Sequence, residues 1–133
     1  MNYSEKIGEI LTKKGWKIST VESCTGGLLS SKLTDVSGSS AYITLNLVTY
    51  SNNAKQKMLN VKNEILEIFG AVSEECAQDM AIGLYNLTKS EICVSTTGVA
   101  GPTGGTIDKP VGLMYSAVCI NGITNVYNTL LVT

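Results

Sequence analysis

The stretch Trp16-Lys-Ile-Ser-Thr-Val-Glu-Ser-Cys-Thr-Gly-Gly-Leu-Leu-Ser-Ser-Lys-Leu-Thr34 combines a short strand, a glycine turn and a helix in immediate succession. Its pattern predicts a strand over Trp16–Val21 and a helix over Leu28–Thr34. Glu22–Gly27 is the predicted turn, and the helix begins at or just before Gly26. Strands followed by helices are typical of α/β proteins, whose sheets usually bind ligands at the C-terminal ends of their strands.

Helices and strands continue to alternate along the chain. The apolar pattern predicts helices over Tyr3–Lys14, Lys55–Leu59, Asn63–Phe69 and Ser73–Thr88, and strands over Tyr42–Tyr50, Glu91–Thr97, Val111–Ile120 and Ile123–Val132. Asn121-Gly122, between the last two strands, is a strong signal for a two-residue hairpin turn. This order predicts an α/β fold with three layers, α/β/α, a mixed, mostly parallel sheet and a C-terminal antiparallel hairpin.

Length and composition predict a single domain over residues 1–133. Apolar residues make up 44% of the chain, which is enough for a buried core. The formal net charge is -1, whereas nucleic-acid-binding domains usually carry a basic patch, so we expect no nucleic-acid partner. The apolar runs are far shorter than the roughly 20 residues of a membrane span, and the charged N-terminus does not resemble a signal peptide. We therefore expect a cytoplasmic protein.

The chain has no histidine, and all ten of its basic residues are lysines. Catalytic triads and dyads that use histidine, and metals that are bound by histidine, are therefore excluded within this chain. Its four cysteines lack the C-x-x-C spacing of zinc and redox sites, so we expect no metal and no cofactor. A serine nucleophile in this chain needs a base other than histidine, and lysine is the best available residue type.

Ser23 is the first candidate for chemistry, because the predicted turn places it beside the N-terminus of a helix. Free N–H groups at such a position favour negative charge and are suited to a tetrahedral oxyanion. We expect the neighbouring residues to contact the substrate, namely Glu22, Thr25, Gly26 and Gly27. The alternative is a purely structural turn, since serine, threonine and glycine also favour turns that have no function.

Lys55 is the second candidate. It follows the predicted strand that ends at Tyr50, and it lies in the first turn of the next helix. The positive end of the helix dipole and partial burial both lower the pKa of a lysine at this position. A lysine with a nearly neutral pKa is able to take a proton from a serine hydroxyl. The alternative is a solvated lysine on a helix surface, where most lysines lie.

A glycine-rich segment after the predicted strand Glu91–Thr97 is the third candidate. Backbone N–H groups and threonine hydroxyls in such a segment suit an anion. The residues expected to contact the substrate are Thr97, Gly98, Gly101, Gly104 and Gly105. The alternative is a plain connecting loop, although structureless loops longer than about 12 residues are usually functional. If the three preceding strands are parallel, all three candidate segments lie at one edge of the sheet.

Several blocks of the sequence resemble the C-terminal domain of the CinA family in order and spacing. The blocks are Glu22–Gly27, Leu33–Asp35, Gly38–Ala41, Val48–Asn52 with Ala54-Lys55, Gly70–Glu74, Gly98–Pro102 with Gly104-Gly105, and Lys109–Gly112. Together they cover essentially the whole chain. The resemblance implies a serine–lysine amidohydrolase without a metal, similar in activity to nicotinamide mononucleotide deamidase, which forms nicotinic acid mononucleotide and ammonia.

The resemblance also implies a role for each site residue. Ser23 is expected to be the nucleophile, Lys55 its base and Tyr50 a supporting hydroxyl. The residues on the side of the oxyanion are expected to be Thr25, Gly26 and Gly27. The Gly98–Thr106 loop is expected to contact the nucleotide.

The resemblance carries two expectations about the whole molecule. Family members usually continue past the final strand with a Gly-Asp-Arg type segment and a helix, so we expect this chain to lack the family's last helical segment. We also expect a homo-oligomer, either a dimer or a larger assembly. Two other functions remain open: a serine–lysine hydrolase of another small amide, and a non-catalytic nucleotide-binding module linked to competence or DNA damage.

Overall fold

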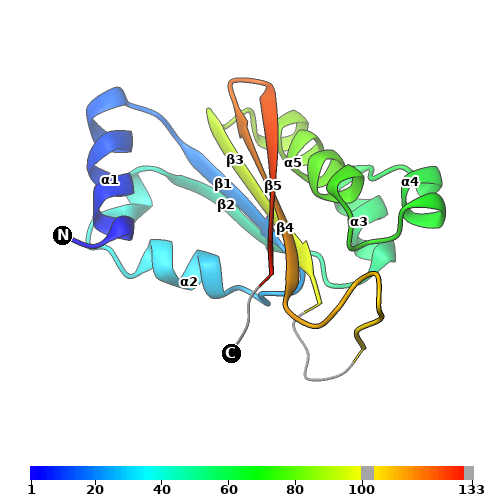
Figure 1. Cartoon of the computed structure of the whole chain (residues 1–133). Helices are drawn as coiled ribbons and strands as arrows, with labels where there is room; N and C mark the ends of the chain where they lie inside the picture. The colour runs from blue at the N-terminus through cyan, green and yellow to red at the C-terminus, as the bar shows by residue number, and fades with distance from the viewer. Residues whose placement is uncertain (100–103, 131–133) are drawn as a thin grey trace.

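A five-stranded sheet with the strand order β2-β1-β3-β4-β5 forms the centre of the molecule (Figure 1). The computed structural model describes residues 1–99 and 104–130. The strands are β1 (Ile18–Glu22), β2 (Ile43–Val48), β3 (Ile92–Gly98), β4 (Leu113–Ile120) and β5 (Ile123–Leu130). The helices are α1 (Tyr3–Lys14), α2 (Leu28–Thr34), the 3-10 helix η1 (Ser39–Ala41), α3 (Asn52–Leu59), α4 (Asn63–Ile68) and α5 (Glu74–Thr88).

The topology of the sheet confirms the predicted α/β fold. Strand β1 pairs in parallel with β2 on one side and with β3 on the other. Strands β4 and β5 extend the sheet as an antiparallel hairpin. Helices α1 and α2 lie on one face of the sheet, and α3, α4 and α5 lie on the other (Figure 1). The three parallel strands bring their C-terminal ends to one edge, where the candidate residues were expected.

Two apolar clusters join the helices to the sheet. The larger cluster lies under α5 and contains the buried residues Val21, Leu59, Val61, Cys76, Ala77, Met80, Ala81, Leu84, Cys93, Ala117 and Cys119. The smaller cluster lies under α1 and α2 and contains Leu11, Ile18, Leu33 and Tyr42. Three of the four cysteines are thus ordinary core residues, since cysteine packs as a small apolar side chain. In the part of the chain that the structure describes, no helix is long and apolar enough to cross a bilayer.

The turns follow the chemistry of their residues. Asn121 and Gly122 have φ values of 50° and 88°, as a two-residue hairpin turn with positive φ at both positions requires, and the predicted hairpin is confirmed. Strand β4 begins at Leu113 rather than at Val111, because Gly112 turns the chain with a φ of 94°.

Candidate active site at the strand ends

Backbone hydrogen bonds place the first two candidate segments side by side. The N–H of Ser23, directly after β1, donates to the Thr96 carbonyl of β3 at 3.1 Å. The N–H of Thr49, directly after β2, donates to the Glu22 carbonyl of β1 at 2.8 Å. The parallel pairing therefore continues one residue beyond the strands and fixes the position of each segment. Ser23 and the chain that leads to Lys55 are held on neighbouring strands.

Lys55 and Ser23 are in direct contact. The Nζ of Lys55 lies 3.1 Å from the Oγ of Ser23. The same nitrogen donates to the carbonyl oxygens of Thr49 at 2.9 Å and Tyr50 at 3.2 Å. The Lys55 side chain is only 1% exposed, and Ser23 is 8% exposed. The predicted serine–lysine pair is thus brought together, and the alternative of a solvated surface lysine does not hold.

Burial lowers the pKa of Lys55 below its ordinary value. Ionised thiols at Cys76 and Cys24 would oppose this shift, but burial raises the pKa of both thiols, that of Cys76 to about 11. Both thiols therefore stay neutral at neutral pH. Within residues 1–99 and 104–130, no carboxylate lies within salt-bridge distance of Lys55, as the one ion pair joins Lys13 to Glu9. The surroundings of the amine thus favour its neutral form.

A cavity of about 410 Å³ opens beside this pair. Pockets for small ligands commonly measure about 300–1,000 Å³. The residues that line it are Ser23, Cys24, Tyr50, Lys55, Ala71, Val72, Thr97, Gly98, Val99 and Gly104. All three candidate segments contribute to its wall, together with the connection between α4 and α5. Ala71 and Val72 belong to the Gly70–Glu74 block that resembles the family, but nothing in their residue types indicated a place in the cavity wall.

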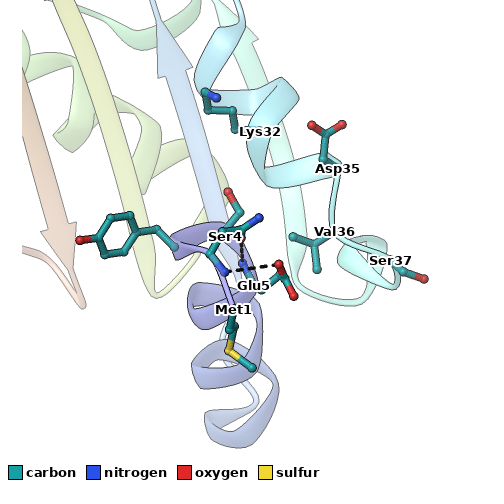
Figure 2. A pocket seen from close by; sticks show the side chains of 9 residues that line it. Met1, Ser4, Glu5, Lys32, Asp35, Val36 and Ser37 are labelled. Atoms are coloured by element: carbon teal, nitrogen blue, oxygen red, sulfur yellow. Dashed lines mark hydrogen bonds between the residues drawn. The ribbon is translucent and has the colours of Figure 1, made fainter.

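A larger cavity, of about 870 Å³, lies at the other end of the α1–α2 layer (Figure 2). The N-terminus of α1 and the loop after α2 form its wall, with Glu5, Lys32 and Asp35 among the lining residues. The backbone N–H of Glu5 and the side chain of Asn2 form a helix cap there. The smaller cavity is the candidate active site, because it contains a serine in contact with a buried amine.

Glu22 has a structural role that the sequence analysis did not predict. Its fully buried carboxylate accepts hydrogen bonds from the backbone N–H groups of Leu29 (2.7 Å) and Ser30 (2.9 Å) and from the hydroxyls of Thr25 (2.6 Å) and Ser30 (2.5 Å). Burial alone would raise the pKa of Glu22, but these hydrogen bonds together lower it. Because the carboxylate is enclosed and does not line the cavity, the expected contact between Glu22 and the substrate is corrected.

The backbone of the turn after β1 also differs from expectation at Gly26. The N–H of Gly26 donates to the Ser23 carbonyl at 3.3 Å, so it is not free for an oxyanion. Gly26 and Gly27 have φ values of 62° and 108°, which side chains disfavour, and this conformation explains both glycines. In the described ranges, the N–H groups of Cys24, Thr25 and Gly27 have no hydrogen-bond partner on the backbone. The free donors of the turn are these three groups.

The third candidate segment reaches the cavity with three of its described residues named in the prediction. Thr97 lines the cavity, and its hydroxyl donates to the Ala71 carbonyl at 2.7 Å. Gly98 also lines the cavity, and a Cβ there would lie 2.5 Å from the Leu113 carbonyl oxygen. Gly104 lines the cavity, whereas Gly105 packs against Val111 outside it. Gly101 lies outside the described residues.

Tyr50 borders the cavity with a side chain that is 76% exposed. Its observed contact with Lys55 runs through its backbone carbonyl, not through its hydroxyl. The supporting role expected for the Tyr50 hydroxyl stays a prediction. A carbonyl contact of this kind carries no sequence signal, because every residue type has the same carbonyl group.

Residues 1–132 match the model of the CinA C-terminal domain. The chain belongs to this family. A putative competence-damage inducible protein of Clostridium perfringens is 53% identical over 122 residues, which are 92% of this chain and 30% of that protein. A CinA-like protein of Chloroherpeton thalassium is 54% identical over 125 residues, which are 94% of this chain and 29% of that protein. The chain therefore spans about 30% of the length of these relatives.

Solved structures of the CinA family share the fold over almost the entire chain. The competence damage-inducible protein A of Klebsiella pneumoniae superposes with a TM-score of 0.94 at 33% identity, covering 98% of this chain and 81% of that one. A competence/damage inducible protein of Agrobacterium tumefaciens superposes with a TM-score of 0.93 at 42% identity, covering 96% of this chain and 78% of that one. The sheet and helix arrangement is thus that of the family.

Proposed function

We propose that this CinA-family domain hydrolyses the carboxamide of nicotinamide mononucleotide to nicotinic acid mononucleotide and ammonia. Ser23 is the nucleophile and Lys55 is its base. The observation that carries the proposal is the buried Lys55 amine, 3.1 Å from the Ser23 hydroxyl and held by two carbonyl groups. The choice of the nucleotide as substrate rests on the likeness to the family. Ammonia release from nicotinamide mononucleotide tests this choice.

The first step is attack by Ser23. Neutral Lys55 has two N–H groups, which match the Thr49 and Tyr50 carbonyls, and one lone pair, which is left for the Ser23 proton. As the proton moves to Nζ, the serine oxygen bonds to the carboxamide carbon and the carbonyl oxygen becomes an oxyanion. Backbone N–H groups of the turn stabilise this charge.

Collapse of the tetrahedral intermediate releases ammonia. The protonated Lys55 gives its proton to the departing nitrogen, and an ester between Ser23 and the substrate remains. Water then attacks the ester, with Lys55 again accepting a proton, and the serine hydroxyl is restored. Each proton that Lys55 takes up is returned within the cycle, so the dyad needs no co-reactant other than water.

The decisive experiment measures ammonia release from nicotinamide mononucleotide by the wild type, Ser23→Ala and Ser37→Ala. Ser37 is an exposed serine in the wall of the larger cavity and serves as the matched control. We expect activity in the wild type and in Ser37→Ala, and a loss of roughly 10⁴–10⁶-fold in Ser23→Ala, as in other serine hydrolases.

Other outcomes separate the remaining functions. Hydrolysis of a different small amide but not of the nucleotide would identify another serine–lysine amidohydrolase. Nucleotide binding without ammonia release by a folded wild type would identify a non-catalytic binding module. Near-normal activity in Ser23→Ala would remove the nucleophile from the proposal.

A further inference from the structure

Helix α2 begins close to Ser23, yet its first N–H groups are already bound. The Glu22 carboxylate accepts the N–H groups of Leu29 and Ser30, at 2.7 and 2.9 Å. A negative charge of the protein thus occupies the place that an anion takes at the start of a helix. An oxyanion formed at Ser23 must therefore be bound by other donors.

The turn itself supplies free donors beside the nucleophile. The N–H groups of Cys24 and Thr25 have no backbone partner among residues 1–99 and 104–130, and Cys24 lines the cavity with Ser23. Burial raises the pKa of the Cys24 thiol, and these same two N–H groups act against that rise by favouring its ionised form. The two N–H groups thus face the sulfur of Cys24, a residue that lines the same cavity as Ser23.

The Thr25 side chain holds this turn against strands β1 and β3. Its hydroxyl donates to the Glu22 carboxylate at 2.6 Å and lies 3.0 Å from the Thr96 hydroxyl at the end of β3. The Thr96 carbonyl in turn accepts the N–H of Ser23 at 3.1 Å. Thr25 is therefore bound to β1 through Glu22 and to β3 through Thr96, and the nucleophile is bound to the same residue of β3.

We propose that Glu22 and Thr25 are a positioning pair, which aims the N–H groups of Cys24 and Thr25 at the oxyanion of the tetrahedral intermediate. The proposal rests on the proposed function through Ser23 as nucleophile. Neither side chain touches the substrate; both act through the backbone of the turn. Because the charge develops only in the transition state, loss of the pair lowers kcat and leaves KM unchanged.

The test compares Thr25→Val with Ser30→Ala. Each variant removes one hydroxyl from the Glu22 carboxylate, but only Thr25 belongs to the turn. We expect Thr25→Val to lower kcat for ammonia release by up to about 100-fold, the loss that a misplacement of about 1 Å can cause in an active site. Ser30→Ala keeps the wild-type kcat, although both variants lower Tm. Thr25→Ser restores the hydroxyl and with it kcat.

Three results would overturn the proposal: equal kcat losses in Thr25→Val and Ser30→Ala, a higher KM at constant kcat in Thr25→Val, or no rescue by Thr25→Ser.

A second readout is the rate at which a fluorophosphonate labels Ser23, because phosphonylation also develops negative charge on an oxygen at this position. If the wild type does not hydrolyse the nucleotide, the proposed function fails. The labelling rates still test whether Glu22 and Thr25 position the oxyanion donors. Slower labelling of Thr25→Val than of Ser30→Ala supports the pair; equal rates, or an unlabelled wild type, overturn it.

Discussion

The proposed chemistry depends on one amine, that of Lys55. Burial of Lys55 removes the water that would stabilise its charge, and its pKa falls. The carbonyls of Thr49 and Tyr50 fix the direction of two N–H groups, so that the third position on the nitrogen faces the Ser23 hydroxyl. At this scale the structure shows how a chain without histidine holds a buried amine against a serine hydroxyl.

The activity should therefore rise with pH as Lys55 loses its proton, with a midpoint below the ordinary lysine value of about 10.4. The sign follows from the mechanism, because only the neutral amine accepts the serine proton. Lys55→Arg should be inactive at all pH values, since arginine keeps its proton. Lys57→Arg, an exposed lysine of the same helix, is the matched control and should behave as the wild type. The measurement is ammonia release against pH for the three proteins.

Substantial activity in Lys55→Arg would contradict the role of Lys55 as base. Lys55 would then be only an electrostatic partner of Ser23. The next residue to test as base would be Tyr50, which borders the same cavity.

Cys24 should be dispensable for the reaction, although it lies beside Ser23 in the cavity. Burial raises the pKa of its thiol, so the reactive thiolate is scarce at neutral pH. Cys24→Ala should retain ammonia release with a kcat close to that of the wild type. An inactive Cys24→Ala together with an active Ser23→Ala would reverse the two roles.

At the scale of elements, helix α3 positions Lys55. The Ser51 side chain caps its N-terminus, and Asn60 ends it with a φ of 57°. The helix packs against α5 at Gly83, where a Cβ would lie 2.1 Å from the Leu59 carbonyl oxygen. This close approach of two backbones sets the depth at which α3 places Lys55.

Gly83→Ala should therefore reduce both stability and activity. The added methyl group meets backbone atoms that cannot move without a shift of α3, and overpacking of this kind costs about 1–3 kcal/mol. Gly8→Ala is the control, because it adds the same methyl group to a helix against the Tyr42 side chain, on the opposite face of the sheet from α3 and α5. Thermal unfolding and ammonia release should separate the two variants: Gly8→Ala keeps its kcat. Unchanged kcat in Gly83→Ala would contradict the role given to this contact.

At the scale of the whole molecule, β5 is an edge strand of the described sheet, and the strand's own sequence has none of the usual protective features. Its residues Ile123–Leu130 include no charged residue and no proline, and its pairing with β4 is regular. Side chains of Ile123 and Tyr127 on this strand are exposed by 72% and 56%. Natural proteins usually protect edge strands with charges, prolines or bulges, because an open edge pairs with other strands.

We expect a second copy of the chain to pair at this edge, since most oligomers of identical chains are symmetric and use the same surface twice. Light scattering should give a mass above that of the monomer. Tyr127→Lys should lower the mass toward the monomer, because it places like charges close together in such a pair. Ile107→Lys, at a fully exposed residue outside β5, is the control and should not change it. A monomeric wild type would contradict the expectation.

The sequence by itself determined the elements and the residue types of the site. Patterns within a few residues decide a helix, a strand or the Asn121-Gly122 turn, and these local patterns predicted the α/β fold that the structure has. The absence of histidine leaves lysine as the best residue type for a base. Residue types and their positions after predicted strands made Ser23 and Lys55 candidates, and the resemblance to the family implied their roles.

Only the tertiary structure decided which groups meet. Ser23 and Lys55 are 32 positions apart, and their contact depends on β1 and β2 being neighbours in the sheet. In the same fold, the Glu22 carboxylate binds the N–H of Leu29, and the N–H of Gly26 binds the Ser23 carbonyl. Buried polar groups need hydrogen-bond partners, and the fold decides which partners are near. Periodicity in a sequence records which side of an element is buried. It does not record which distant carbonyl or carboxylate will lie against that side.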